Sequence, residues 1–409
     1  MLPTSRVTLP DGLQLRAAKQ GDLEQAAALL VARGEPADAV DMRLVVGDSD
    51  EGLTACGVVV DGARVVSTAT LLRETVVIEG VPIPAGQVEM VATDPAYEGR
   101  GLVRALMDWA HERSAARADL LQVMIGIPYF YRQFGYGYAM PIPLVRPVVA
   151  DGSTADPAVV VRRATPDDIT AMVHLQDEAQ SGAGVRVPHS PACWRWLLAR
   201  DGSSQLVAER DGHIAATCRI TPPDEGVTIA ELAGEPGAAR ALVAHARALG
   251  TGEVGVVERP GTAAFEAIRP NLAPLDGPDA IPDWFYARVD QLGPLLQHLA
   301  PVLVGRLERA GLADRRHEVL LSSWRSHVRF SIGPDGMSEV ISGGPEQGPV
   351  SKGGSGVPPD AIPALLLGPD GATGLEERLP DCWLGRQREL MSALFPPMRS
   401  DLLTFYLAV

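Results

Sequence analysis

Pro-Ala-Tyr-Glu-Gly-Arg-Gly-Leu-Val, residues 95–103, separates two segments with different hydrophobic periods. The segment before it, Val88 to Thr93, is predicted to be a strand. After it, apolar residues recur at helical spacing, at Leu102, Val103, Leu106, Met107 and Ala110. A glycine-bearing turn at a helix start presents unpaired backbone N–H groups and the positive end of the helix dipole. The stretch therefore predicts a strand–turn–helix unit that can cradle a pyrophosphate.

Two arginines of this unit, Arg100 and Arg104, can add charge-assisted contacts to a phosphate. Glycine-rich turns between a strand and a helix are nevertheless common in proteins that bind no phosphate. Taken alone, the turn leaves a purely structural role open.

An aromatic run follows the helix. A predicted strand at 121–125 leads into residues 129–138, Tyr-Phe-Tyr-Arg-Gln-Phe-Gly-Tyr-Gly-Tyr. The chain has only 6 Trp, 7 Tyr and 7 Phe, and six of these aromatics lie in this run. A tyrosine phenol that is held in place by packing can donate a proton to a leaving thiolate. A packed aromatic core is the alternative for any one of these tyrosines.

The first part of the chain is repeated in outline. Three features recur in the same order: the strands at 15–17 and 161–163, the helices that follow Asp22 and Asp168, and the Asp-Gly hairpin turns at 61–62 and 211–212. A strand–loop–helix unit also recurs: Val88 to Ala110 in the first copy corresponds to a segment that begins at Val227. Each copy is therefore predicted to be a mixed α/β unit.

The pattern changes after residue 297. A helical run is predicted at 295–312 and a strand pair at 328–332 and 337–341. These elements predict a smaller α+β domain. The predicted fold class is therefore α/β (α+β), with two tandem mixed sheets flanked by helices in residues 1–150 and 151–297 and the smaller domain in residues 298–409.

Composition narrows the possible functions. The chain has 409 residues, 36 Lys and Arg against 51 Asp and Glu, and a formal net charge of −15. A protein this acidic, without a basic cluster, is not expected to bind nucleic acid, whereas it can attract cationic small molecules.

Location and metal binding are predicted from what the sequence lacks. Its cysteines are far apart, and its histidines show no metal-binding spacing, so no metal site is predicted. No apolar run approaches the length of a membrane span, so a cytoplasmic protein is expected.

The turn, its flanking elements and the run Tyr-Arg-Gln-Phe-Gly-Tyr-Gly at 131–137 together resemble the GNAT superfamily of acyl-CoA N-acetyltransferases. The whole chain resembles the Eis (enhanced intracellular survival) branch, which combines a catalytic GNAT domain, a degenerate second one and a C-terminal domain like sterol carrier protein. Residues 360–368, Asp-Ala-Ile-Pro-Ala-Leu-Leu-Leu-Gly, match this last domain more loosely.

The resemblance implies a site that binds acetyl-CoA as co-substrate. A strand backbone would pair with the pantetheine arm and the amides of the turn would hold the pyrophosphate. The implied coenzyme-binding residues are Val91, Thr93, Gly99, Arg100, Gly101, Leu102 and Val103. Tyr131 matches the family's general acid, and the terminal carboxylate of Val409 matches its general base.

Two departures from the family pattern bear on these roles. Glu98 occupies a position where the turn usually carries Gln or Arg, which brings a negative charge near the phosphates. Three residues follow Tyr406, whereas chains of this branch end at or near an aromatic residue. If the terminus extends past the site, an acidic side chain or a water is the alternative base.

The expected activity is transfer of an acetyl group from acetyl-CoA to a primary amine, on a cationic small molecule of aminoglycoside or polyamine type or on a lysine side chain. Only the first copy is expected to bind the coenzyme, because the second has Ala241 where the first has Gly101. The resemblance also implies a homo-hexamer. A non-catalytic protein that binds acyl-CoA or lipid is the alternative.

Overall fold

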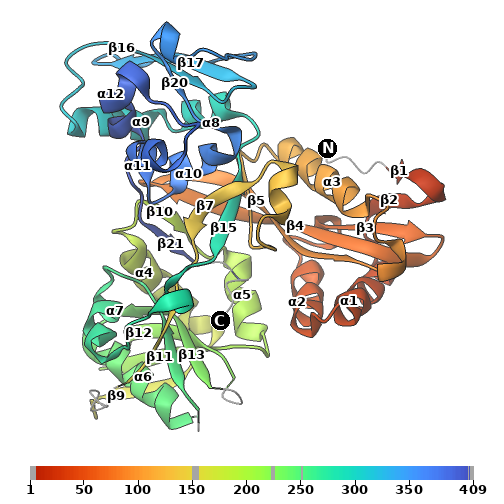
Figure 1. Ribbon diagram of the computed structural model, residues 1–409. Coiled ribbons are helices and arrows are strands. Elements are labelled where there is room, and N and C mark those ends of the chain that lie inside the picture. Colours follow the sequence, from red (N-terminus) through yellow and green to blue (C-terminus); the bar gives the residue numbers. More distant parts are fainter. Residues whose placement is uncertain (1–5, 150–155, 223–225, 250–251, 404, 406–409) are drawn as a thin grey trace. The chain divides into compact units, whose positions relative to one another are not determined.

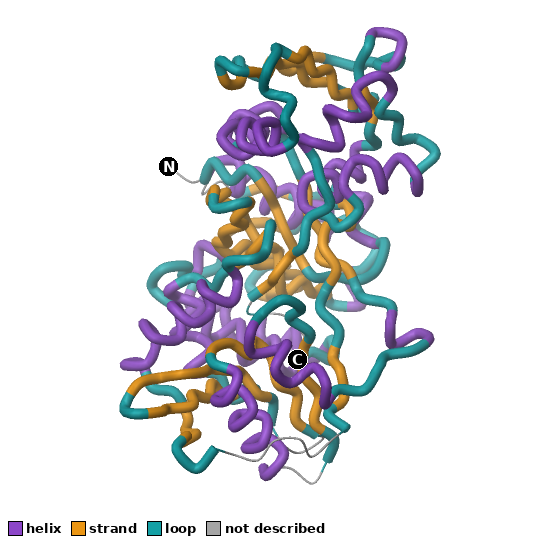
Figure 2. The backbone as a smooth tube through the Cα atoms, turned by 90° about the vertical axis from the view of Figure 1, so that its left-hand side faces the viewer, coloured by secondary structure: helices purple, strands orange, loops and turns teal. Residues whose placement is uncertain are grey.

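The structure is a computed structural model that describes residues 6–149, 156–222, 226–249, 252–403 and 405. The chain divides into two compact units. The first comprises Met1–Gly34, Leu53–Pro141 and Trp284–Ser400, and the second comprises Glu35–Gly52, Ile142–Asp283 and Asp401–Val409. Within each unit the strands, orange in Figure 2, are accompanied by helices in purple. This arrangement confirms the predicted mixed α/β class.

The main sheet of the first unit has the strand order β1-β2-β3-β4-β5-β6-β15-β7. Its strands are β1 (Val7–Thr8), β2 (Gln14–Ala17), β3 (Cys56–Asp61), β4 (Arg64–Ile78), β5 (Val81–Thr93), β6 (Leu121–Met124), β7 (Gly137–Pro141) and β15 (Trp284–Arg288). Strands β5 and β6 are parallel, and the other neighbours in this order are antiparallel.

Helices α1 (Leu23–Ala32) and α3 (Leu102–Ala116) cover opposite faces of this sheet (Figure 1). The predicted apolar face of α3 is buried apart from Val103, which is half-buried. Trp109 of the same helix lies directly over Gly57 of β3, where a Cβ atom would come within 2.8 Å of the indole ring. The absence of a side chain at Gly57 therefore sets how closely α3 approaches the sheet.

Strand β15 joins the first sheet from far along the chain. After β7 the chain builds the second unit and then returns to insert β15 between β6 and β7. Tyr286 stands opposite Met124 on one side and Tyr138 on the other. The domain boundaries at 150/151 and 297/298 stay a prediction. Strand β15 shows that the first sheet includes residues that precede the second unit in sequence and residues that follow it.

The C-terminal part of the first unit has its own sheet, with the order β18-β17-β16-β20 and with β19 beside β17. Its strands are β16 (His317–Ser322), β17 (His327–Gly333), β18 (Gly336–Met337), β19 (Ile341–Gly343) and β20 (Ser355–Gly356). Its helices are α8 (Leu292–His298), α9 (Ala300–Arg309), α10 (Ile362–Leu367), α11 (Gly371–Arg378) and α12 (Arg388–Leu394).

Two predicted elements of this part are divided in the structure. The helical run at 295–312 forms α8 and α9, because Pro301 cannot donate a backbone hydrogen bond and its ring crowds the preceding turn. The strand expected at 337–341 is likewise split between β18 and β19.

This C-terminal part packs against the main sheet of the same unit. Arg306 of α9 is buried, contacts Glu79 Oε1 through its Nε at 2.7 Å, and donates to the Leu394 oxygen at 2.7 Å. Strand β7 meets the backbone of Asp360, whose oxygen would be only 1.9 Å from a Cβ atom at Gly137. The two parts therefore share a tightly packed, charge-paired boundary.

The second unit is built on a sheet with the order β8-β14-β13-β12-β11-β9. Its strands are β8 (Val145–Pro147), β9 (Val159–Arg163), β11 (Ser204–Arg210), β12 (His213–Ile220), β13 (Val227–Gly234) and β14 (Val254–Val257). Its helices are α2 (Pro36–Gly47), α4 (Ile169–Gln180), α5 (Pro191–Ala199), α6 (Pro236–Leu249) and α7 (Ala263–Ile268). A short strand β10 (Val185–Val187) pairs with β21 (Ser400–Leu402).

The two copies of the predicted repeat make the same contacts at the start of their first helix. At the start of α1, Asp22 pairs with Arg16 at 2.5 Å and accepts from the Lys19 nitrogen at 2.7 Å. At the start of α4, Asp168 pairs with Arg162 at 2.7 Å and accepts from the Thr165 nitrogen at 2.8 Å. The parallel pair β5–β6 has its counterpart in β13–β14.

No helix in the described part of the chain is long and apolar enough to cross a membrane. The four cysteines form no disulfide bonds and are buried.

Replacing Gly137 with Ala should destabilise the first unit. The new Cβ atom would overlap the backbone of Asp360, which cannot move as a flexible side chain can. Overpacking of this kind costs about 1–3 kcal/mol. We expect a lower midpoint in thermal unfolding followed by circular dichroism. Gly344→Ala is the matched control, because no atom lies within 4 Å of its added Cβ; equal midpoints for the two variants would contradict the close contact.

Candidate active site

A pocket of about 540 Å³ opens in the first unit, beside the C-terminal end of β5. Three segments form its walls: the end of β5, the turn into α3, and the loop that carries the aromatic run. Its lining residues are Arg33, Val91, Ala92, Thr93, Tyr97, Glu98, Gly99, Gly101, Leu102, Val103, Arg104, Ile127, Phe130, Tyr131, Gln133 and Phe134. The fold therefore brings together the two motifs that the sequence singled out.

The pocket exists because β5 and β6 separate. Their registered pairs run only from Ala85 to Gln87 on β5. Beyond them, Met90 has a φ of 52° and lies in a bulge, since the pairing with β4 shifts between Glu89 and Ala92. A bulge kinks a strand and re-aims its side chains. Val91 and the residues after it thus diverge from β6 and line the pocket.

The turn into α3 takes the conformation expected of a phosphate cradle. Gly99 and Gly101 have φ values of 74° and 76°, which side chains disfavour. Gly101 is the N-terminal cap of α3, a helix of 15 residues. The first amides of the helix have no intrahelical acceptor and lie at the positive end of its dipole. This end of the pocket can bind an anion such as a pyrophosphate.

Arg100 lies in the turn, but its side chain is engaged elsewhere. Its Nη2 donates to the Ala96 oxygen at 3.1 Å, and its guanidinium lies 4.8 Å from the centre of the Tyr97 ring. Its nearest acidic partner is Asp11, at 3.8 Å. Of the seven predicted coenzyme-binding residues, Arg100 is the one that does not line the pocket.

Two other arginines bring positive charge to the pocket. Arg33, at the end of α1, pairs with Glu98 at 3.0 Å. This ion pair offsets the negative charge that made Glu98 a departure from the family pattern. Arg104 donates to Gln133 Oε1 at 3.1 Å, which ties α3 to the aromatic loop. Sequence reasoning missed Arg33, because only the folding of α1 onto the sheet carries it to the turn.

Tyr131 forms the inner wall of the pocket and is 6% exposed. Its ring covers Gly126, where a Cβ atom would come within 2.3 Å of Cε2. Burial, together with the negative charge of Glu89, raises the pKa of Tyr131 to about 12. The phenol therefore keeps its proton at neutral pH, as a general acid requires.

Glu89 is a second group that sequence analysis did not single out. It lies on β5, is 9% exposed, and its Oε1 accepts from Gln87 Nε2 at 2.5 Å. After burial, its negative charge is the second cause of the raised pKa of Tyr131. A carboxylate inside a strand gives no distinctive sequence signal, because its burial depends on the covering elements.

The predicted general base, the carboxylate of Val409, lies outside the described residues. The last described residue is Phe405, whose ring lies 5.7 Å from that of Trp196 and under the guanidinium of Arg200. Leu403 donates its backbone N–H to the Val187 oxygen at 2.8 Å. These contacts are all made within the second unit.

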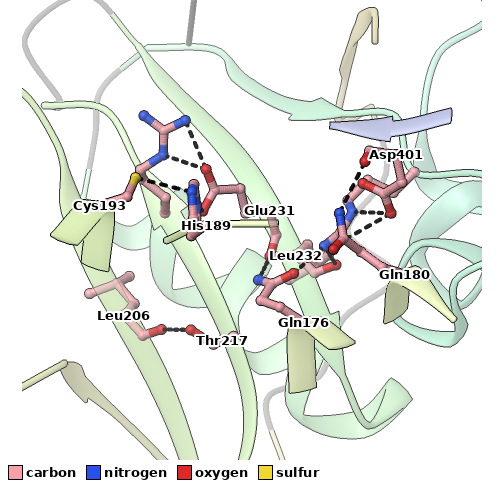
Figure 3. A network of polar contacts seen from close by, with 11 residues as sticks. Gln176, Gln180, His189, Cys193, Leu206, Thr217, Glu231, Leu232 and Asp401 are labelled. Carbon is pink, nitrogen blue, oxygen red and sulfur yellow. Dashed lines mark hydrogen bonds and ion pairs between the residues drawn. The ribbon is translucent and has the colours of Figure 1, made fainter. Parts of the chain in front are cut away.

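At the corresponding place in the second copy, the strand backbone is already bonded to side chains. Glu231, like Met90, has a positive φ, of 57°. Its backbone oxygen accepts from Gln176 Nε2 at 2.6 Å, and Arg259 donates to the Leu232 oxygen at 3.2 Å (Figure 3). Arg259 also pairs with Asp401 at 2.9 Å. These side chains occupy the strand end that, in the first copy, lines the pocket.

The Glu231 side chain completes this network. Its Oε2 lies 2.9 Å from His189 Nε2, and its Oε1 pairs with Arg219 at 2.9 Å. His189 Nδ1 in turn lies 3.2 Å from the sulfur of Cys193 (Figure 3). The neighbouring Arg219 and His189 hold the pKa of Glu231 below its usual range despite its burial. We interpret the group as a buried, charge-compensated core.

Among the described residues, no three His, Cys, Asp or Glu side chains gather as a metal site would require.

Comparison with known proteins agrees with this geometry. Residues 14–139 match the sequence family described as an acetyltransferase (GNAT) domain. A search of the curated proteins found no match.

Solved structures share the fold over nearly the whole chain. A probable N-acyltransferase from Enterococcus faecalis is 12% identical, with a TM-score of 0.68, over 96% of this chain and 100% of that one. A GCN5-related N-acetyltransferase from Kribbella flavida is 17% identical, with a TM-score of 0.67, over 96% and 100%. Eis1 from Mycobacterium abscessus is 18% identical, with a TM-score of 0.57, over 95% and 99%.

Replacing Arg33 with Gln should weaken binding of acetyl-CoA about threefold to tenfold. The change removes a cation from the pocket and leaves Glu98 uncompensated at the turn into α3. Titration calorimetry measures the dissociation constant. Arg100→Gln is the comparison, because its side chain points to Ala96 and Tyr97 instead. A larger loss for Arg100→Gln than for Arg33→Gln would contradict this assignment of the charges.

Proposed function

We propose that this acyltransferase, whose residues 14–139 match a GNAT acetyltransferase domain, transfers the acetyl group of acetyl-CoA to a primary amine. One observation carries the proposal. A single pocket joins a helix N-terminus suited to a pyrophosphate with a buried, protonated phenol at Tyr131. The helix N-terminus suits the pyrophosphate of acetyl-CoA, and the phenol suits the thioester, at which the coenzyme reacts.

The coenzyme would lie along the pocket from the turn to the aromatic loop. Backbone amides from Gly99 to Val103 would hold the pyrophosphate, with Arg33 and Arg104 nearby. The pantetheine arm would pair with β5 at Val91 and Thr93, on the side where β6 has diverged. In this pose the thioester would lie near Tyr131.

The chemistry then follows from three groups. A base removes a proton from the acceptor amine, whose nitrogen attacks the thioester carbonyl carbon. The Val91 N–H donates to the oxygen that becomes negatively charged in the tetrahedral intermediate. As the carbon–sulfur bond breaks, Tyr131 gives its proton to the departing thiolate, and the Tyr131 phenolate then takes back the second proton that the nitrogen loses, leaving coenzyme A and the acetylated amine.

The acceptor we favour is a cationic amine, either a small molecule of aminoglycoside or polyamine type or a lysine side chain. The formal charge of −15 supports this class, because a negative field concentrates cations near the protein.

We also propose four further features that the family resemblance implies. They are the division into domains at 1–150, 151–297 and 298–409, the likeness of the last one to sterol carrier protein, assembly as a homo-hexamer and a location in the cytoplasm. The separate C-terminal sheet supports the third domain.

The test is thiol release from acetyl-CoA with neomycin, spermine and a lysine-containing peptide as acceptors. We expect turnover with at least one of them, and a loss of about 100-fold in kcat for Tyr131→Phe, within the range for removing a general acid. Binding of acetyl-CoA should change little, since the turn and β5 are untouched.

The pH profile checks the same assignment. Because the pKa of Tyr131 is raised from 10.0 to about 12, the protonated, active form persists and is lost only as pH rises through the higher value. The wild type should therefore keep its activity up to about pH 10.

A kcat of the Tyr131→Phe variant equal to that of the wild type would remove Tyr131 from the mechanism. Coenzyme binding without turnover for every amine would favour the alternative of an acyl-CoA-binding protein.

The general base is tested by extending the chain by one residue beyond Val409. If the terminal carboxylate is the base, displacing it should lower kcat about 100-fold, with no change in acetyl-CoA affinity. The comparison variant is Glu89→Gln, which removes the carboxylate whose negative charge raises the pKa of Tyr131. Full activity after the extension, together with a large loss for Glu89→Gln, would replace Val409 by Glu89.

A further inference from the structure

The loop that leads into Tyr131 has an unusual backbone and an exposed position. Ile127 and Tyr129 are 65% and 70% exposed. Tyr129 has a φ of 68°, which is rare for a residue with a bulky side chain. Ile127 and Phe130 line the pocket on either side of it. A strained, solvent-exposed segment keeps one conformation only when neighbouring groups hold it.

Tyr286 is such a neighbour. Its hydroxyl accepts from the backbone nitrogen of Tyr129 at 2.6 Å and donates to the backbone oxygen of Ile127 at 3.3 Å. One phenol thereby bridges the two residues that define the bend of the loop. Tyr138 supplies a second acceptor for the same nitrogen at 3.0 Å, and its ring stacks on that of Tyr286 at 4.8 Å.

The ring of Tyr286 also supports Tyr131 directly. The two rings lie 6.2 Å apart in an edge-to-face arrangement, and Tyr286 is fully buried. The opposite constraint on Tyr131 is Gly126, whose missing side chain leaves room for the phenol ring. Tyr131 thus lies in a slot formed by its own loop and by β15.

We infer that Tyr286 is a positioning residue for the general acid: it holds residues 127–129 so that the Tyr131 hydroxyl meets the departing thiolate. The inference rests on the proposed role of Tyr131. It assigns a function to a strand that lies outside residues 14–139, the part that matches the acetyltransferase family. Tyr286 enters the site only through the return of the chain after the second unit.

Asp360 of the C-terminal part holds the other side of the same loop. It pairs with Arg132, the residue after Tyr131. The loop is therefore fixed by later segments of the chain at both ends. Displacement of a catalytic group by about 1 Å can cost about 100-fold in rate, so even a small relaxation is measurable.

The experiment compares Tyr286→Phe with the wild type, using acetyl-CoA and the fastest amine of the panel. Phe keeps the ring but removes both hydrogen bonds to the loop. We expect kcat to fall about tenfold, with the acetyl-CoA dissociation constant within about twofold, because the turn and β5 are unaffected. The loss stays below that of Tyr131→Phe because Tyr138 still accepts from the Tyr129 nitrogen.

Tyr136→Phe is the matched control. Its ring also packs against Tyr131, at 6.4 Å, and it is equally buried, but its hydroxyl bonds to His111 instead of the loop. We expect this variant to keep the wild-type kcat. A double variant separates positioning from general destabilisation: in a Tyr131→Phe background, Tyr286→Phe should cause no further loss of kcat, because the group it positions is gone.

A crystal structure of Tyr286→Phe with coenzyme A provides a readout that needs no activity. We expect the loop to relax and the Tyr131 hydroxyl to shift. An unmoved Tyr131 would overturn the inference, as would a kcat within twofold of the wild type, or additive losses in the double variant. If Tyr131→Phe is fully active, the proposed acid fails and positioning fails with it. If only Tyr286→Phe is fully active, the proposed function stands and the inference alone is wrong.

Discussion

The separation of β5 from β6 is the constraint on which the rest of the site depends. The two strands are paired only from Ala85 to Gln87, and the bulge at Met90 then turns the end of β5 away. A continuous parallel pair would fill this space with backbone hydrogen bonds. Because the pairing stops, the strand end lines a pocket, the turn at Gly99 to Gly101 lies at one end of it, and Tyr131 lies at the other. Glu231 marks a similar bulge in the second copy, where the side chains of Gln176 and Arg259 bond to the strand instead.

An open strand end needs support from elsewhere, and here the support comes from distant parts of the chain. Strand β15 lies between β6 and β7, and the C-terminal part packs under β7 at Gly137. These segments reach the aromatic loop through Tyr286 and Asp360. The unit that holds the pocket therefore extends beyond residues 14–139, the part that matches the acetyltransferase (GNAT) domain family. Its later segments complete the sheet and fix the loop, which links the C-terminal part to the proposed chemistry.

Much of the fold and most of the site followed from local patterns. The helix at Leu102–Ala116, the turn with its two glycines and the repeated helix starts at Asp22 and Asp168 all occur as predicted. These features depend on residues close in sequence, so their spacing is informative. Arg33 and Glu89 were missed for the opposite reason. Each has an ordinary local context, and only long-range packing brings it to the pocket or buries it beside Tyr131. The helix predicted at 295–312 was divided by Pro301, a local signal that the apolar pattern obscured.

By itself, the sequence determined the mixed α/β class, the internal repeat, the strand–turn–helix unit and the Tyr131 run, because periodicity, glycine positions and an aromatic cluster express local conformational preferences. The tertiary structure alone decided which side chains share the pocket, that Arg33 lines it while Arg100 does not, and that Tyr286 bonds to the loop before Tyr131. These outcomes depend on strand order and on the return of the chain from the second unit. Strand order is set by the burial of whole faces and the pairing of distant backbones, which no local window of sequence contains.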